Sequence, residues 1–187
     1  MRRSRAQIPR PQLAASMSAL AIVCPFRLEV RAAELRCRRE RGMQSTVDLL
    51  VNALAAWAAE QPEILGIGIV GSHARGMAQS GSDIDVVMIV NNPALYLETS
   101  GWAEHFGRTC SIVREDWGLM QSMRVHYENG MEVEFGIAAP AWAGTDPVDP
   151  GTARVVSGGI RLVYDRVGLL GSLVSSLTAS GINADNR

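Results

Sequence analysis

Apolar residues between Ser45 and Pro62 recur three or four positions apart, which is the spacing of one face of an α-helix. They are Val47, Leu50, Val51, Leu54, Trp57 and Ala58. Ser45 is a residue type that caps helix N-termini, and Pro62 is one that ends helices. The pattern therefore predicts a helix that packs one face against a core.

Two short apolar runs follow, Leu65–Val70 (LGIGIV) and Asp83–Val90 (DIDVVMIV). Both runs are short and rich in β-branched residues, so we expect two buried strands. Between them, Gly71 and Ser72 predict a turn, and residues 73–78 predict a single helical turn that nearby glycines interrupt.

The second half of the chain mixes helical and strand patterns. Asn129-Gly130 is typical of two-residue hairpin loops and predicts an antiparallel strand pair. The pattern predicts helices at Leu95–Phe106 and Leu169–Leu177, strands at Thr109–Arg114, Ser122–Tyr127 and Met131–Ile137, a loop at Pro140–Gly151, and a strand or irregular segment at Val155–Val163. This order of elements indicates a single α/β (α+β) domain with a mixed β-sheet flanked by helices.

The charged residues divide the chain into two parts. Residues 1–42 carry ten Arg and three acidic residues, whereas the remainder carries eight Arg and sixteen acidic residues. We expect residues 1–42 to be a basic extension that is either poorly ordered or helical over Leu28–Arg41. We expect residues 43–180 to form the domain and residues 181–187 a tail. The extension has three interpretations. Residues 1–42 precede a natural start at Met43, or they are a disordered tail, or they are a targeting peptide.

Composition disfavours several classes of protein. The acidic body argues against nonspecific nucleic-acid binding, because phosphate backbones are bound by basic patches. No apolar run reaches the ~20 residues that span a membrane. Cys24, Cys37 and Cys110 lack the spacing of a zinc or disulfide motif. We therefore expect a cytoplasmic protein that binds neither nucleic acid nor membrane, and that meets any polyanionic substrate through a metal ion.

The most informative chemistry lies on the second predicted strand. Asp83 and Asp85 are two positions apart, so both carboxylates leave the same face, while Ile84 and Val86 point to the core. Two neighbouring carboxylates on a half-buried strand repel each other unless a cation lies between them. Mg²⁺ is the ion that combines one or two carboxylates with substrate phosphates.

The Gly71-Ser72 turn comes directly after the first strand. Gly71 allows the backbone to approach a phosphate closely, and Ser72 adds a hydroxyl and an N–H donor. Arg75 follows one helical turn later and can neutralise phosphate charge. The turn is therefore a candidate phosphate site beside the two aspartates.

A third acidic residue is needed either for a two-metal transfer or as a base on the attacking hydroxyl. Glu132 and Glu134 share one face of the strand after the hairpin. We favour Glu134, because Val133 and Phe135 flank it as core residues, and we keep Glu132 as the second candidate or as a supporting residue.

These motifs resemble the signature of the polymerase-beta-like nucleotidyltransferase superfamily, which is G-S-x-x-x-G followed by S-D-I-D on a strand. The resemblance, which is nearest to minimal bacterial and antibiotic nucleotidyltransferases, covers Ile69–Val90 and extends weakly to Glu134. It implies that the Gly-Ser turn holds a triphosphate and that the acidic residues hold metal. On this basis we expect two Mg²⁺ ions on Asp83, Asp85 and Glu134, and nucleotide contacts from Gly71, Ser72, Arg75 and Ser82.

The resemblance also implies a reaction. A nucleoside monophosphate, AMP from ATP, would pass to a hydroxyl of an acceptor and release pyrophosphate. The acceptor is either a small molecule or a protein, and no acceptor-binding domain is recognised beyond Ile137. The alternative is a non-catalytic or antitoxin-like nucleotide-binding module that acts on a partner protein. A homodimer that shares a pocket would compensate for the missing domain.

Overall fold

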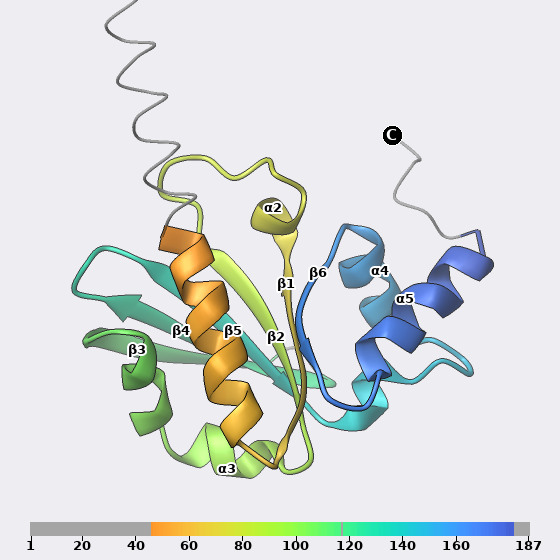
Figure 1. Cartoon of the computed structure of the whole chain (residues 1–187), viewed down its shortest axis with the longest axis horizontal. Coiled ribbons are helices and arrows are strands. Elements are labelled where there is room, and N and C mark those ends of the chain that lie inside the picture. The colour runs from red at the N-terminus through yellow and green to blue at the C-terminus, as the bar shows by residue number, and fades with distance from the viewer. Residues whose placement is uncertain (1–45, 117, 182–187) are drawn as a thin grey trace, which may run out of the picture. The chain divides into compact units, whose positions relative to one another are not determined.

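A six-stranded mixed β-sheet forms the centre of the protein, and helices cover parts of both faces (Figure 1). The computed structural model describes residues 46–116 and 118–181. The expected α/β fold with a mixed sheet is confirmed, whereas the basic extension and the expected tail after residue 181 lie outside the described residues. In the spatial order β3-β4-β5-β2-β1-β6, the strands are Thr109–Asp116, Met120–Tyr127, Glu132–Ala138, Ile84–Val90, Ile64–Val70 and Arg161–Asp165.

Strands β2 and β5 are parallel neighbours in the middle of the sheet, and each of the other neighbouring pairs is antiparallel. The chain leaves β2 at Val90 and returns to its side only at Glu132, after forming β3 and β4. The parallel register places Asp85 beside Glu134. Side chains that are paired in this way point to the same face of a sheet.

The first face of the sheet is covered by the helix at residues 46–60, drawn in orange in Figure 1. Its predicted apolar face is confirmed, since Leu54 and Ala58 are completely buried. Alternate residues of β2, among them Val86 and Met88, pack on this side. Trp57 stacks on Trp102, with 5.7 Å between the ring centroids.

A smaller core covers the second face beside β2 and β1. It contains residues from η2 (Pro140–Ala143), α4 (Pro150–Ser157) and α5 (Leu169–Ala179), which confirms the predicted closing helix. Val87 and Ile89 of β2 point into this core, so Asp85 lies on the same face at its border. The site face of the sheet is therefore apolar at one end of β2 and acidic at the other.

The expected helix at Leu95–Phe106 is two short helices. In α3 (Pro93–Glu98), Asn92 caps the N-terminus by accepting a hydrogen bond from the Ala94 N–H. Thr99 then adopts an extended conformation, which ends α3, and the 3₁₀ helix η1 (Gly101–Phe106) follows. The apolar spacing is that of one helix, but the extended residue interrupts it.

The expected loop at Pro140–Gly151 and the strand or irregular segment at Val155–Val163 also differ from the structure. Residues 140–143 form η2, and α4 begins at Pro150. Asp149 caps α4 by accepting from the Thr152 N–H, at 2.9 Å. In the Asp149-Pro150 step, Asp149 is thus the N-cap and Pro150 is the first helical residue, a position that proline favours. The last strand, β6, starts only at Arg161.

The hairpin between β4 and β5 has a three-residue loop. The Tyr127 N–H donates to the Met131 carbonyl at 2.9 Å, and Gly130 adopts a φ of 81°. Glu128, Asn129 and Gly130 therefore form a turn that ends in a left-handed glycine, a common three-residue hairpin. The antiparallel pair predicted from Asn129-Gly130 is confirmed, with a loop one residue longer than expected.

Among the described residues, no helix is long and apolar enough to cross a membrane.

Candidate active site

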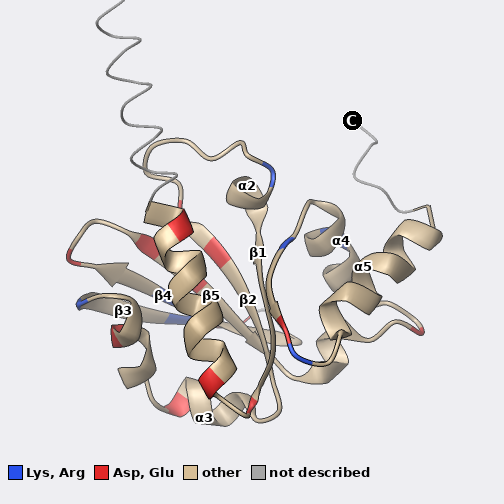
Figure 2. Ribbon diagram, viewed as in Figure 1, with Lys and Arg blue, Asp and Glu red and all other residues tan. Residues whose placement is uncertain are grey.

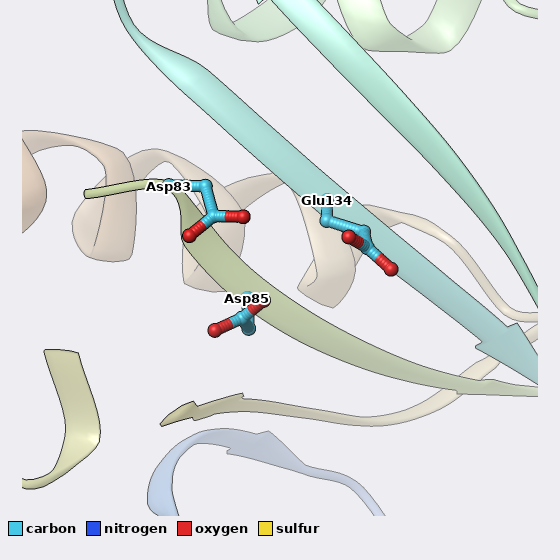
Figure 3. Close-up of side chains that lie close together, drawn as sticks. All are labelled: Asp83, Asp85 and Glu134. Atoms are coloured by element: carbon cyan, nitrogen blue, oxygen red, sulfur yellow. The ribbon is translucent and has the colours of Figure 1, made fainter. Parts of the chain in front are cut away.

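Three carboxylates converge on the second face of the sheet, as the sequence predicts. Asp83 precedes β2, Asp85 is its second residue, and Glu134 comes from the parallel neighbour β5 (Figure 3). One oxygen atom of each residue lies within 4.8 Å of the corresponding atoms of the other two. Strands β2 and β5 carry several acidic positions and no basic ones (Figure 2).

The geometry separates the two candidates for the third acidic residue. Glu134 is paired with Asp85 in the parallel register and belongs to the cluster of three. Glu132 instead accepts from the Arg124 Nη1 atom at 2.7 Å and lies 3.5 Å from the His126 Nε2 atom. Glu134 therefore stays our candidate third carboxylate, with Glu132 as a supporting residue.

Asp85 is the carboxyl group whose protonation the site disturbs most clearly. Burial, followed by repulsion from Asp83 and Glu134, raises its pKa from 3.8 to about 6, against the attraction of Arg124 and Arg75. A hard divalent cation is bound by such oxygen ligands and relieves the same repulsion. The donor set therefore fits Mg²⁺ or a similar ion.

The pKa of Asp85 gives a prediction for the protein in EDTA. Between about pH 4 and pH 6 the folded chain retains a proton that the unfolded chain has lost, so the free energy of unfolding falls as pH rises. This contribution is complete below the unfolded pKa and is lost as pH passes the folded pKa. Thermal unfolding of wild type and Asp85→Asn at pH 4 and pH 7 isolates it. Wild type is expected to lose stability relative to the variant at pH 7, and an unchanged difference would contradict the raised pKa.

A cleft of about 610 Å³ opens beside the carboxylates. Asp85 and Glu134 line one side of it, and α4 lines another. Trp142 also reaches the cleft from the second core, where it is 4% exposed. The remaining lining residues include Val70, Gly71, Arg75, Leu119, Met120, Gly136, Asp149, Thr152, Arg154 and Val155.

Gly71 is the point where the backbone comes closest to the carboxylates. It has a φ of 67°, a conformation that L side chains rarely adopt. A Cβ atom at this position would overlap the Asp85 Oδ2 atom. Gly71 is also the first residue of α2 (Gly71–Ala74). The helix therefore includes the predicted Gly71-Ser72 turn and begins before the helical turn predicted at residues 73–78. Both the conformation and the contact require glycine here.

The other predicted nucleotide contacts are distributed around α2. Arg75 lines the cleft and donates from Nη1 to the Gly158 carbonyl at 3.0 Å. The carbonyl of Ser72 accepts from the Met77 N–H. The Ser82 hydroxyl accepts from the Gln79 N–H, and Ser82 lines a separate hollow of about 210 Å³ with His73. The structure thus brings Gly71 and Arg75 to the cleft, whereas Ser82 borders the other hollow.

Arg124, on β4, is a site residue that the sequence reasoning did not identify. Its guanidinium donates to Asp83 Oδ2 at 3.0 Å, to Glu132, and to Glu134 through a short hydrogen bond. Its Nε atom lies 3.5 Å from a Glu115 oxygen. The structure places Arg124 here because the three-residue hairpin loop pairs it with Glu134, whereas the two-residue loop expected from Asn129-Gly130 would not.

Several other candidates have ordinary positions or fall outside the described residues. Cys24 and Cys37 lie outside the described residues, as does Trp117. Cys110 is exposed, with a free thiol. Trp142 is mainly a core residue that also borders the cleft.

Comparison with known proteins agrees with the site. Residues 45–127 match the family model described as a nucleotidyltransferase domain, a segment that contains Asp83 and Asp85 but ends before Glu134. No curated protein sequence matches significantly.

Solved structures give partial matches. An aminoglycoside 6-adenyltransferase from Bacillus subtilis aligns with a TM-score of 0.39 and 15% identity over 49% of this chain and 34% of that one. A nucleotidyltransferase-like protein from Exiguobacterium sibiricum 255-15 aligns with a TM-score of 0.35 and 16% identity over 67% of this chain and 36% of that one. The chain thus spans about a third of each structure's length. Residues 45–127, the part of the chain that carries Asp83 and Asp85, are thus similar to a nucleotidyltransferase domain.

Proposed function

We propose that the protein transfers a nucleoside monophosphate, AMP from ATP, to a hydroxyl group of an acceptor in a reaction that depends on Mg²⁺. The observation that carries this proposal is the convergence of Asp83, Asp85 and Glu134 within 4.8 Å beside a large cleft. The nucleotidyltransferase family match to the segment that bears both aspartates supports it. The cytoplasmic location and a small-molecule or protein acceptor remain predictions from the sequence.

Different residues are proposed to bind the triphosphate and the divalent ion. The backbone at Gly71 and the guanidinium of Arg75 line the cleft where a triphosphate would bind, and Ser72 and Ser82 are proposed further contacts. Asp83, Asp85 and Glu134 would hold the divalent ion, which neutralises charge on the phosphates when it is bound. Most of the rate enhancement then comes from positioning and from charge stabilisation.

The bond changes in this reaction are simple. The acceptor oxygen attacks the α-phosphorus, the bond from that phosphorus to the bridging oxygen of the β-phosphate breaks, and pyrophosphate leaves. The proton of the acceptor hydroxyl passes to a carboxylate. Glu134 is the carboxylate proposed for this role, because it lines the cleft and belongs to the cluster.

The experiment uses the full chain with Mg²⁺ and ATP labelled at the α-phosphate. Pyrophosphate release and transfer of label are followed with three acceptor probes: an aminoglycoside, a bacterial protein extract and a fraction of small metabolites. Transfer of label to any of these probes supports the proposal. Tight ATP binding without pyrophosphate release in all three would instead favour the non-catalytic nucleotide-binding module.

Two neighbouring glutamates provide a matched comparison for the third carboxylate. Glu134→Gln is expected to lower pyrophosphate release about 10- to 100-fold, because it removes both a ligand and the candidate base. Glu132→Gln is expected to lower it only a few-fold, because Glu132 contacts Arg124 and His126 rather than the cluster. The reverse order of the two losses would assign the role to Glu132.

A further inference from the structure

The guanidinium group of Arg124 lies among four carboxylates on the open part of the second sheet face. Nη1 donates to Asp83 at 3.0 Å and to Glu132 at 2.7 Å, and Nη2 donates to Glu134. Glu115, on β3, lies 3.5 Å from Nε. Two of these four partners, Asp83 and Glu134, are also members of the cluster proposed to hold metal.

The strand register fixes this arrangement. Arg124 is paired with Glu134 across β4 and β5, and Glu134 is paired in turn with Asp85 across β5 and β2. The three side chains therefore form one row across three strands on the same face. The side chain of Arg124 is only 26% exposed. Its position is set by the sheet and not by a mobile loop.

Arg124 contacts two of the three carboxylates in the cluster. Among the described residues, Arg124 forms ion pairs with Asp83 and Glu134 but with no atom of Asp85. Asp85 instead faces the cleft, next to Gly71.

The positions of the cations follow from these contacts. A second divalent ion held by Asp83 and Glu134 would compete with the guanidinium of Arg124, which already donates to both residues. Asp85 and Glu134 both line the cleft, so a divalent ion can approach them from this side. Two ions of a two-metal site lie about 3.5–4 Å apart and share carboxylate ligands, and here Arg124 already bonds to two of those carboxylates.

We propose that Arg124 takes the place of the second cation, so that the nucleotide-free protein binds one divalent ion, on the Asp85 side of the cluster. Arg124 is thus a positioning residue that orients Asp83 and Glu134. This inference rests on the proposed function for the presence of an ion, and it replaces the two ions expected from the sequence. Replacement of Arg124 by an uncharged residue would therefore free Asp83 and Glu134 to bind a second divalent ion.

The test is the stoichiometry of Mn²⁺ binding to the nucleotide-free full chain, measured by calorimetry and by the loss of the free-Mn²⁺ electron paramagnetic resonance signal. Wild type is expected to bind one ion per chain, and Arg124→Gln is expected to bind two. Arg124→Lys keeps the positive charge and is expected to bind one. Arg108→Gln is the matched control, because the 86% exposed side chain of Arg108 contacts only Glu128 among the described residues.

The possible outcomes separate this inference from the proposed function. Two ions on wild type, no ion on wild type, or one ion on a folded Arg124→Gln would overturn the role of Arg124. Circular dichroism establishes whether Arg124→Gln folds. If this variant is unfolded, the number of Mn²⁺ ions bound by wild type and by Arg124→Lys tests the role of Arg124. Pyrophosphate release is measured on the same wild-type sample. Its absence with one bound ion contradicts the proposed function alone, and its presence with two ions contradicts this inference alone.

Discussion

Replacement of Asp85 by asparagine is expected to lower Mg²⁺-dependent pyrophosphate release by about 10³-fold, the scale of losing a major electrostatic group in an active site. The same variant is expected to melt about 2–4 °C above wild type at pH 7 in EDTA. Both effects have one cause, since the half-buried carboxylate proposed to bind the cation is repelled by Asp83 and Glu134 when no cation is present. Loss of activity with gain of stability distinguishes a metal ligand from a structural residue.

Two further variants serve as controls for Asp85→Asn. Asp83→Asn also removes a carboxylate of the cluster, but it breaks the ion pair with Arg124, so no gain in stability is expected. Glu128→Gln changes a 58% exposed side chain in the hairpin loop and is expected to leave both measurements unchanged. Wild-type turnover in Asp85→Asn would remove the basis of the proposed mechanism.

Replacement of Gly71 by alanine is expected to lower pyrophosphate release about 100-fold and to destabilise the protein by about 2–3 kcal/mol. The positive φ of 67° accounts for roughly 1–2 kcal/mol of this loss. The remainder comes from the overlap of the new Cβ atom with Asp85 Oδ2. A displacement of about 1 Å of Asp85, a proposed metal ligand, is enough for the loss of rate. Denaturant unfolding and the pyrophosphate assay measure the two effects.

Gly76 is a close control for Gly71. It has a φ of 69°, and a Cβ atom there would meet no other atom within 4 Å. Gly76→Ala is therefore expected to cost only about 1 kcal/mol of stability and to retain its activity. Equal losses of activity in the two variants would show that the contact with Asp85 does not matter.

The sequence was sufficient for the parts of the fold that depend on local periodicity. The helix at residues 46–60 and the strands β1 and β2 follow directly from apolar spacing, and they set the positions of Asp83 and Asp85. The segment around α4 was not predicted, because Asp149-Pro150 is compatible both with a turn and with a helix N-terminus. Tertiary contacts favour the helix, because Val156 packs into the second core and the Thr152 hydroxyl donates to the Trp142 carbonyl.

The role of Arg124 was missed because of one residue in a hairpin loop. A two-residue loop at Asn129-Gly130 would pair Val125 with Glu134 and turn Arg124 to the other face. The three-residue loop pairs Arg124 with Glu134 instead. Loop length depends on the backbone of Gly130, which residue type alone does not fix. The carboxylates were predictable because they lie on strands with clear core faces, whereas their cationic neighbour depended on register.

Strand β5 lies in the middle of the sheet but outside the segment that the family model matches. A fragment ending at Tyr127 would contain β1 to β4, but β4 would have no partner joining it to β2, because β5 lies between them. During synthesis, the hairpin of β3 and β4 therefore cannot join β2 in the sheet until residues 132–138 have been made. The addition of β5 joins β4 to β2 and also brings Glu134 beside Asp85, so the central part of the sheet and the acidic cluster form in one event.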